Sequence, residues 1–135
     1  MRNDARYHEG LHLFRERQWF ECHEVLEALW RELPRGPGRD YVQGLIQLAV
    51  SLEHWRRGNP RGAWGQWTKA RAKFEGLPPT YEGVALAELL TAFDGLWASV
   101  RLEDAVAAQA EGRPCTSAVT EWPTPRLVED PPPSS

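Results

Sequence analysis

Two side chains that can bind a metal or move a proton lie four residues apart in the segment 20–30. They are the imidazole of His23 and the carboxylate of Glu27, and the indole of Trp30 follows three residues later. The segment contains no Gly, no Pro and only one β-branched residue, so its composition favours a helix. Residues four apart share one helical face, and the imidazole and the carboxylate should therefore lie side by side.

A second group of polar side chains lies in the segment 39–57. No charged residue occurs between positions 41 and 52, and a helix of that kind is buried on nearly all sides. Gln43, Gln47 and His54 nevertheless fall within about 40° of one another on a helical wheel. The segment therefore predicts a central, mostly apolar helix that carries one polar stripe.

The two predicted helices are joined by breaker residues at positions 34–38, so we expect them to pack antiparallel. This alignment sets Gln47 within reach of His23 and Glu27, and it sets His54 about one turn beyond His23. The predicted constellation is His23, Glu27, Gln47 and His54, with Gln43 and Glu24 at its margins.

The functional interpretation of this constellation is a divalent metal held by His23 and Glu27, with His54, Gln47 or a water completing the shell. Imidazole and carboxylate groups suit Zn, Mn, Fe or Ni. The pattern is His-Glu-x-x-Glu, so the helix supplies one histidine and not the two of the zinc proteases. A catalytic zinc uses three protein ligands and one open position. Glu24 is the candidate general base, although it lies on the more exposed side. The residues expected around the ligands are Gln43, Gln47 and Trp30.

The alternative interpretation is a structural hydrogen-bond network that performs no chemistry. His23 would donate to Glu27 or Gln47, and Trp30 would donate its indole N–H to an acceptor. Such a buried network fixes helix register. Metal-free acid–base or ligand-binding work is a third interpretation. Cys22 points about 100° away from His23, which disfavours a Cys–His nucleophile pair.

The hydrophobic pattern of the whole chain predicts an all-α fold, a compact bundle of about five helices in antiparallel pairs with no credible strand. The helices are expected at about 3–17, 19–33, 39–57, 60–75 and 80–111. Their predicted N-caps include Asn3, Asn59 and Thr80.

A single domain is expected for a chain of 135 residues. We expect residues 1–111 to form one helical domain. Residues 112–135 are rich in Pro, Ser and Thr and predict a tail with little regular structure. Trp122 and Leu127 are the candidate anchors of that tail on the surface.

Composition excludes several classes of protein. The net charge is −3 and no Lys/Arg run exceeds the pair Arg56-Arg57, so a nucleic-acid partner is not expected. Cys22 and Cys115 imply neither a disulfide framework nor a cysteine-based zinc site. No signal peptide or membrane span is predicted, so we expect a cytoplasmic protein without a membrane partner. Seven Trp is many for this length and favours an interface, with a homodimer as the candidate assembly.

The segment 19–30 resembles the bacterial and archaeal family called domain of unknown function 309. His23, Glu27 and Trp30 fit the family pattern His-x-x-x-Glu-x-x-(Trp/Tyr). Cys22 departs from the small residue that the family usually has before the histidine. The resemblance covers roughly residues 7–75 and continues through Gln43–Ala49, His54, Gly58-Asn59 and Gly62-Ala63. It implies an all-helical fold and suggests that the motif binds a metal, with a hydrolase as the candidate activity and no implied substrate.

These observations together predict a small all-α cytoplasmic protein of uncharacterised activity that binds one divalent transition metal. A metal-dependent hydrolase is the candidate enzyme class. The alternative is a non-catalytic helical interaction or scaffold module, in which the His/Glu/Gln cluster is a buried structural network. The substrate is unknown in either case.

Overall fold

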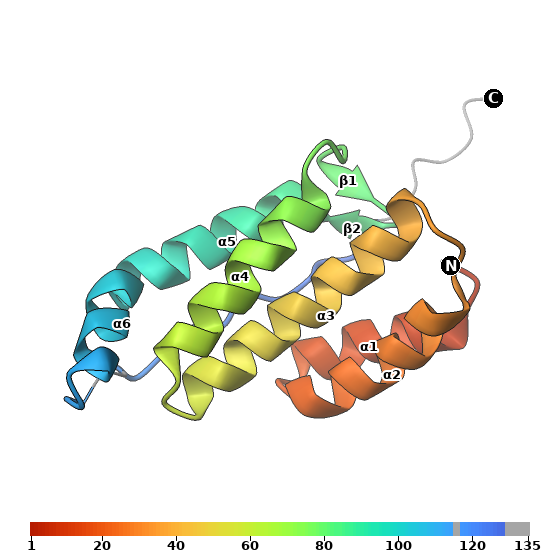
Figure 1. Cartoon of the computed structure of the whole chain (residues 1–135). Helices are drawn as coiled ribbons and strands as arrows, with labels where there is room; N and C mark the ends of the chain where they lie inside the picture. Colours follow the sequence, from red (N-terminus) through yellow and green to blue (C-terminus); the bar gives the residue numbers. More distant parts are fainter. Residues whose placement is uncertain (115–116, 129–135) are drawn as a thin grey trace.

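The computed structural model describes residues 1–114 and 117–128. This part of the chain folds into helices that pack in antiparallel contacts, with one very short β-hairpin (Figure 1). The elements are α1 (Ala5–Arg15), α2 (Trp19–Glu32), α3 (Pro37–Arg56), α4 (Pro60–Phe74), β1 (Thr80–Tyr81), β2 (Val84–Ala85), α5 (Leu86–Ser99) and α6 (Leu102–Ala110). The predicted all-α class is confirmed. Within the described residues, no helix has both the length and the apolar character that a membrane crossing requires.

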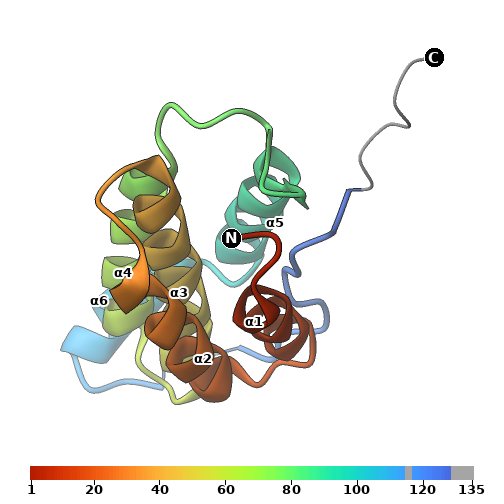
Figure 2. The same cartoon turned by 90° about the vertical axis from the view of Figure 1, so that its right-hand side faces the viewer.

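Helix α3 is the centre of the bundle, as the absence of charge between positions 41 and 52 predicts. Eleven of its 20 residues are buried, and α2 and α4 pack along it from two sides (Figures 1 and 2). The contact with α4 is very close at Gly44, where a Cβ atom would lie 2.6 Å from the ring of Phe74. Glycine is therefore needed here because the two helices leave no room for a side chain.

Helix α5 covers the other side of the core. Its Phe93 stacks on Trp67 of α4, with ring centroids 5.2 Å apart, and meets the edge of Phe14 of α1 at 6.5 Å. Aromatic pairs in these arrangements contribute more than their buried area alone. The aromatic side chains of three helices therefore join α1, α4 and α5 into one core.

The segment after α4 differs from the prediction of one long helix starting at Thr80. Thr80 lies in β1, and a hairpin with Glu82 and Gly83 at its tip precedes α5. Both tip residues have positive φ (47° and 78°), as a two-residue type I′ turn requires. A second break comes at Arg101, whose φ of 52° separates α5 from α6. The expectation of no strand was wrong, and the single helix expected at about 80–111 is two helices, α5 and α6.

Of the predicted N-caps Asn59 and Asn3, the first is confirmed and the second is not. Asn59 caps α4, because its side chain accepts a hydrogen bond from the backbone N–H of Gly62 at 3.1 Å. The cap of α1 is Asp4 and not Asn3: the Asp4 carboxylate accepts from the backbone N–H of Arg6 at 2.9 Å. The shift by one residue places the stronger acceptor at the helix start.

The described part of the C-terminal tail, residues 117–128, runs along the molecule past α1 (Figure 2). Trp122 meets Trp19 edge to face at 4.9 Å, so it contacts the core as expected. Leu127 is 43% exposed and takes part in a backbone bridge with Val84 of β2. Positions 115–116 and 129–135, which include Cys115 and the proline run at 131–133, lie outside the described residues.

Candidate functional site

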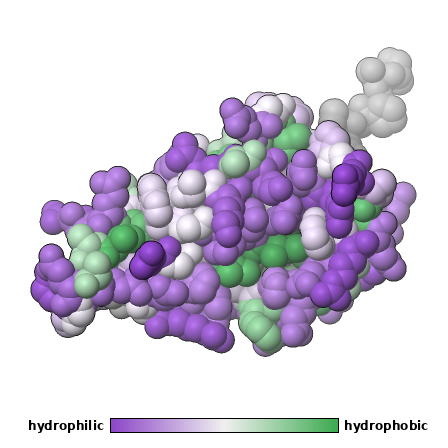
Figure 3. Space-filling view, viewed as in Figure 1, coloured by the Kyte–Doolittle hydropathy of each residue, from purple (hydrophilic) through white to green (hydrophobic). Residues whose placement is uncertain are grey.

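A pocket of about 240 Å³ lies between the first half of α2 and the last half of α3. It is lined by Trp19, Phe20, His23, Val50, Glu53, His54 and Arg57. The antiparallel packing of the two helices thus brings His23 and His54 to one site, hereafter the α2–α3 pocket. Apolar surface is visible along the boundary of these two helices (Figure 3). Most of the wall surface is apolar, although four of the seven lining side chains carry polar groups: His23, Glu53, His54 and Arg57.

The motif of α2 forms a ladder of three polar side chains on successive turns. His23 Nε2 lies 2.9 Å from Glu27 Oε2, and Arg31 Nη2 lies 2.6 Å from Glu27 Oε1. The side chains of His23 and Glu27 are 32% and 30% exposed. The carboxylate is therefore held at both oxygens by its own helix, at the border between the core and solvent.

His54 is oriented by residues at the start of α4. Its Nδ1 lies 3.1 Å from the amide nitrogen of Asn59. The amide oxygen of Asn59 accepts from the N–H of Gly62 and from Gln109 Nε2 at 2.8 Å, which determines the direction of the amide. A Cβ atom on Gly62 would lie 2.7 Å from the His54 ring, so glycine is required there.

The proton position on His54 follows from these contacts. An amide nitrogen can only donate, so Nδ1 of His54 accepts and the proton of the neutral ring is on Nε2. In this tautomer Nε2 is a hydrogen-bond donor, and it has no free electron pair for a metal ion. His54 can bind a metal ion through Nε2 only if the ring proton moves from Nε2 to Nδ1. Nδ1 can then no longer accept the hydrogen bond from Asn59.

The His23–Glu27 pair fits two positions of a metal shell. Ligand atoms about 2.0–2.2 Å from a metal ion are about 3.3–3.6 Å apart in the tetrahedral shell of zinc and about 3 Å apart in an octahedral shell. The 2.9 Å separation of His23 Nε2 and Glu27 Oε2 is close to the octahedral value, and it is also the length of a direct hydrogen bond between the two side chains. Residues 1–114 and 117–128 contain no group of three or more His, Cys, Asp or Glu side chains placed to hold a metal ion. The described side chains thus supply a pair of ligands and not a complete set.

Two other predicted residues, Trp30 and Gln43, do not line the α2–α3 pocket. Trp30 and Gln43 line a separate pocket of about 290 Å³ near the start of α3. The guanidinium of Arg39 stacks over the Trp30 ring at 4.2 Å from its centroid. Trp30 Nε1 and Gln47 Oε1 are buried, and neither has a hydrogen-bond partner among the described residues. The hydrogen bonds that the network interpretation expected from Trp30 and Gln47 are therefore not formed among the described residues.

Two glutamates differ from what the sequence suggested, because Glu53 lines the α2–α3 pocket and Glu24 does not. Glu24, the candidate general base, is exposed and is not part of the α2–α3 pocket wall. Glu53 was missed, although it is buried and pairs with Arg56 and with Arg57, whose Nε lies 2.9 Å away. The spacing of Glu53 from the two arginines, three and four residues, is the signal in the sequence that could have indicated this cluster.

Cys22 adjoins the motif but lies in the core. Its thiol is buried, and burial raises its pKa to about 12, because the thiolate loses its hydration. A thiol of this kind is almost entirely protonated at neutral pH and is a poor nucleophile. This agrees with the expectation that a Cys–His nucleophile pair is disfavoured.

Part of this chain is similar to a described family and to two curated proteins. Residues 7–65 match the family described as "Domain of unknown function (DUF309)". The uncharacterized protein YpuF of Bacillus subtilis (strain 168) is 53% identical over 47 residues, which cover 35% of this chain and 27% of that protein. An uncharacterized protein of Aquifex aeolicus (strain VF5) is 25% identical over 71 residues, covering 53% and 21% of the two chains. The match thus spans about a quarter of the length of these curated relatives.

Proposed function

Because residues 7–65 match the family described as domain of unknown function 309, whose description assigns no activity, we propose a function from the side chains themselves. We propose that the α2–α3 pocket is a binding site and that His23, which lines it, binds one divalent transition metal ion together with Glu27. The observation that carries the proposal is the 2.9 Å separation of His23 Nε2 and Glu27 Oε2. Arg31, which bonds the other carboxylate oxygen, supports it by orienting Glu27.

The proposed activity is that of a metal-dependent hydrolase. A bound Zn or Mn ion would supply Lewis-acid activation of water. In the wild-type tautomer, the Nε2–H of His54 donates a hydrogen bond to a ligand in the pocket. His54 becomes a third metal ligand if its ring proton moves to Nδ1 and the hydrogen bond from Asn59 is lost. Glu24 would need to act from outside the pocket, so a base role for it depends on a substrate that extends over α2.

Elemental analysis of untagged protein, purified without chelator, tests this proposal together with titration by Zn, Mn, Fe and Ni salts. We expect a near-stoichiometric metal in the wild type and its loss in His23→Ala and in Glu27→Gln. His12→Ala is the matched control, since His12 is an exposed histidine on α1. A wild-type protein that stays metal-free when offered all four ions would overturn the metal site and the hydrolase with it.

The second candidate is an interaction module in which two copies of the chain meet over the α2–α3 pocket. The specific observation in its favour is Phe20, a pocket residue that is 50% exposed. Large aromatic side chains at the rim of an apolar pocket are typical anchors of protein interfaces. In this reading the His23–Glu27 pair is a structural contact and the pocket performs no chemistry.

Sedimentation velocity distinguishes the second candidate from the first. We expect a dimer at micromolar concentration that Phe20→Glu converts to a monomer. Leu127→Glu is the control, because Leu127 is also exposed (43%) but lies on the tail. A wild-type monomer at all concentrations would exclude the homodimer.

A further inference from the structure

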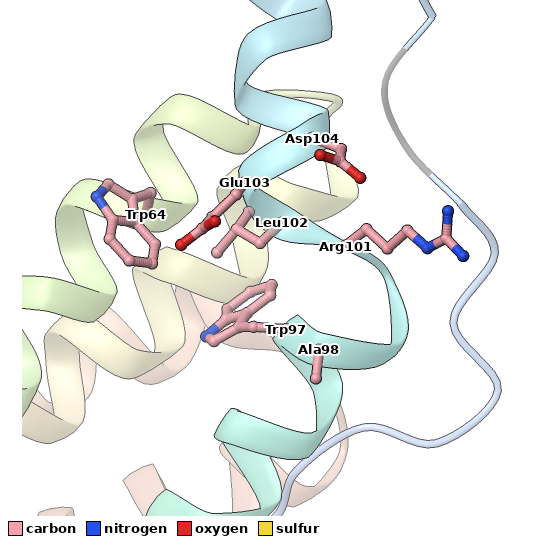
Figure 4. Close-up of a pocket in the computed structure, with 7 residues that line it drawn as sticks. All are labelled: Trp64, Trp97, Ala98, Arg101, Leu102, Glu103 and Asp104. Carbon is pink, nitrogen blue, oxygen red and sulfur yellow. The ribbon is translucent and has the colours of Figure 1, made fainter.

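A second pocket, of about 420 Å³, lies where α4, α5 and α6 meet, away from the α2–α3 pocket. Two tryptophans from different helices line it, Trp64 of α4 and Trp97 of α5. Figure 4 shows the two indoles extending toward each other, with the carboxylate of Glu103 from α6 between them. The volume is in the range of pockets that bind small molecules.

The charge of this pocket is unbalanced toward the negative. Glu103 and Asp104 both lie in the first turn of α6. Within residues 1–114 and 117–128, neither carboxylate makes an ion pair or a side-chain hydrogen bond. Arg101 also lines the pocket, but its guanidinium points away from the two indoles (Figure 4). No described side chain therefore neutralises Glu103.

Trp97 and Trp64 each have one feature that the packing of the domain does not explain. Trp97 is only 6% exposed, yet its indole N–H has no hydrogen-bond partner in the described part of the chain. Trp64 is 40% exposed, which is unusual for so large an apolar side chain. An unpaired buried donor and an exposed indole at one cavity indicate a site whose partner comes from outside the domain.

We propose that this pocket binds a small organic cation with an alkylated ammonium group, held by the two indoles and paired with Glu103. Tryptophan is the strongest cation–π partner among the side chains, and alkylated ammonium groups are its typical ligands because they are weakly hydrated. A carboxylate beside the aromatic pair adds charge attraction. A hydroxyl oxygen on the ligand could accept from Trp97.

Titration of ¹⁵N-labelled protein with choline tests the proposal, with the indole N–H signal of Trp97 as the local readout. The uncharged isostere 3,3-dimethylbutan-1-ol has the same shape and hydroxyl group but no charge. We expect choline to shift the Trp97 signal and the isostere to bind at least several-fold more weakly. Trp64→Leu and Glu103→Gln should each raise the Kd for choline roughly three- to tenfold.

Matched variants separate this site from general effects. Leu127→Ala removes an exposed apolar side chain elsewhere, and Glu9→Gln removes an exposed carboxylate elsewhere, so both should leave the Kd unchanged. Equal binding of choline and its uncharged isostere, or no shift with either, would overturn the cation site. Tighter binding of Nα-acetylarginine amide than of choline would overturn the small-molecule assignment in favour of a basic side chain. The result is independent of the metal titration, because His23→Ala leaves this pocket intact.

Discussion

At the scale of single residues, the direction of one amide decides what His54 can do. Asn59 donates to Nδ1 of His54 and accepts from Gly62 and Gln109. Residues that hold a histidine in this way select its tautomer, as they do around metal-binding histidines. His54 also lines the α2–α3 pocket, and its selected tautomer carries the ring proton on Nε2. The identity of residue 59 therefore controls whether the pocket contains a donor or a potential metal ligand.

Exchange of the amide for a carboxylate should reverse the proton position on His54. Asn59→Asp keeps the oxygen that caps α4 but replaces the donor with an acceptor, so Nδ1 of His54 must then carry the proton. Long-range ¹H–¹⁵N NMR spectra distinguish the two ring tautomers. We expect the wild type to show Nε2–H and Asn59→Asp to show Nδ1–H, with tighter metal binding if His54 joins the proposed site.

Asn59→Ala is the control for this experiment, because it loses the cap without offering an acceptor. Loss of an N-cap costs about 1 kcal/mol of stability. The same tautomer in the wild type and in Asn59→Asp would contradict the assigned direction of the amide.

Buried acids predict how stability depends on alkaline pH. Burial raises the pKa of Cys22 to about 12 and that of Tyr7 to about 12, and it also raises the pKa of Tyr41, whose hydroxyl lies 2.8 Å from that of Tyr7. The unfolded chain releases these protons near pH 9 for the thiol and pH 10 for the phenols. The folded state retains them, so the stabilisation is complete below pH 9 and is lost as pH rises toward 12.

Urea unfolding between pH 8 and pH 11 measures this dependence. We expect the free energy of unfolding to fall above pH 9, by up to about 1.4 kcal/mol per pH unit for each group that titrates. In Cys22→Ala the part of the decline between pH 9 and pH 10 should become smaller. An unchanged slope in that variant would mean that the thiol does not contribute.

At the scale of elements, the bundle depends on how closely its helices approach. Helices α3 and α4 make the most extensive contact between elements of the described structure, and at Gly44 the ring of Phe74 leaves no room for a side chain. Gly65 lies on α4, the same helix pair, but a Cβ atom there would meet nothing within 4 Å. These two glycines separate the effect of packing from the effect of helix propensity.

Substitution by alanine should act in opposite directions at these positions. In Gly44→Ala the new methyl group overlaps the ring of Phe74, and overpacking of a core costs about 1–3 kcal/mol. In Gly65→Ala the methyl group points into open space, and the better helix former adds up to about 1 kcal/mol. Thermal unfolding followed by circular dichroism measures both. A stabilised Gly44→Ala would show that α3 and α4 can separate at little cost.

At the scale of the whole molecule, the tail is part of the folded structure up to residue 128. Trp122 covers Trp19, a core residue that is 1% exposed, and Arg15 bonds the backbone of Pro125. The carbonyl of Arg126 accepts from the N–H of Ala85, which extends the hairpin. The tail therefore joins the first two helices to the hairpin that precedes α5.

Truncation tests this role of the tail. A chain that ends at residue 114 loses the cover of Trp19, so we expect a lower Tm and a red shift of tryptophan fluorescence. The burial of part of one indole suggests a loss of about 1–3 kcal/mol. A chain that ends at residue 128 keeps every contact named above and is the control. Equal Tm values for the two truncations would mean that the tail contacts contribute nothing measurable.

The sequence by itself determined the local elements of this protein. Apolar periodicity and breakers place α1 to α4 within a few residues, because helix formation and capping depend on neighbours in the chain. The sequence also indicated the polar stripe on α3 and the motif on α2, and the antiparallel packing of these helices brings His23 and His54 to one pocket. The sequence did not indicate the β-hairpin at positions 80–85 or the break at Arg101, since short strands and single left-handed residues leave weak patterns.

Only the tertiary structure decided the surroundings of those side chains. The sequence places Glu53 near two arginines, but its burial depends on how α3 meets α2. The tautomer of His54 depends on Asn59 at the start of another helix, and the Trp64–Trp97 pocket requires α4, α5 and α6 together. Burial, hydrogen-bond direction and cavity shape are set by residues far apart in the chain, and one-dimensional periodicity carries little information about them.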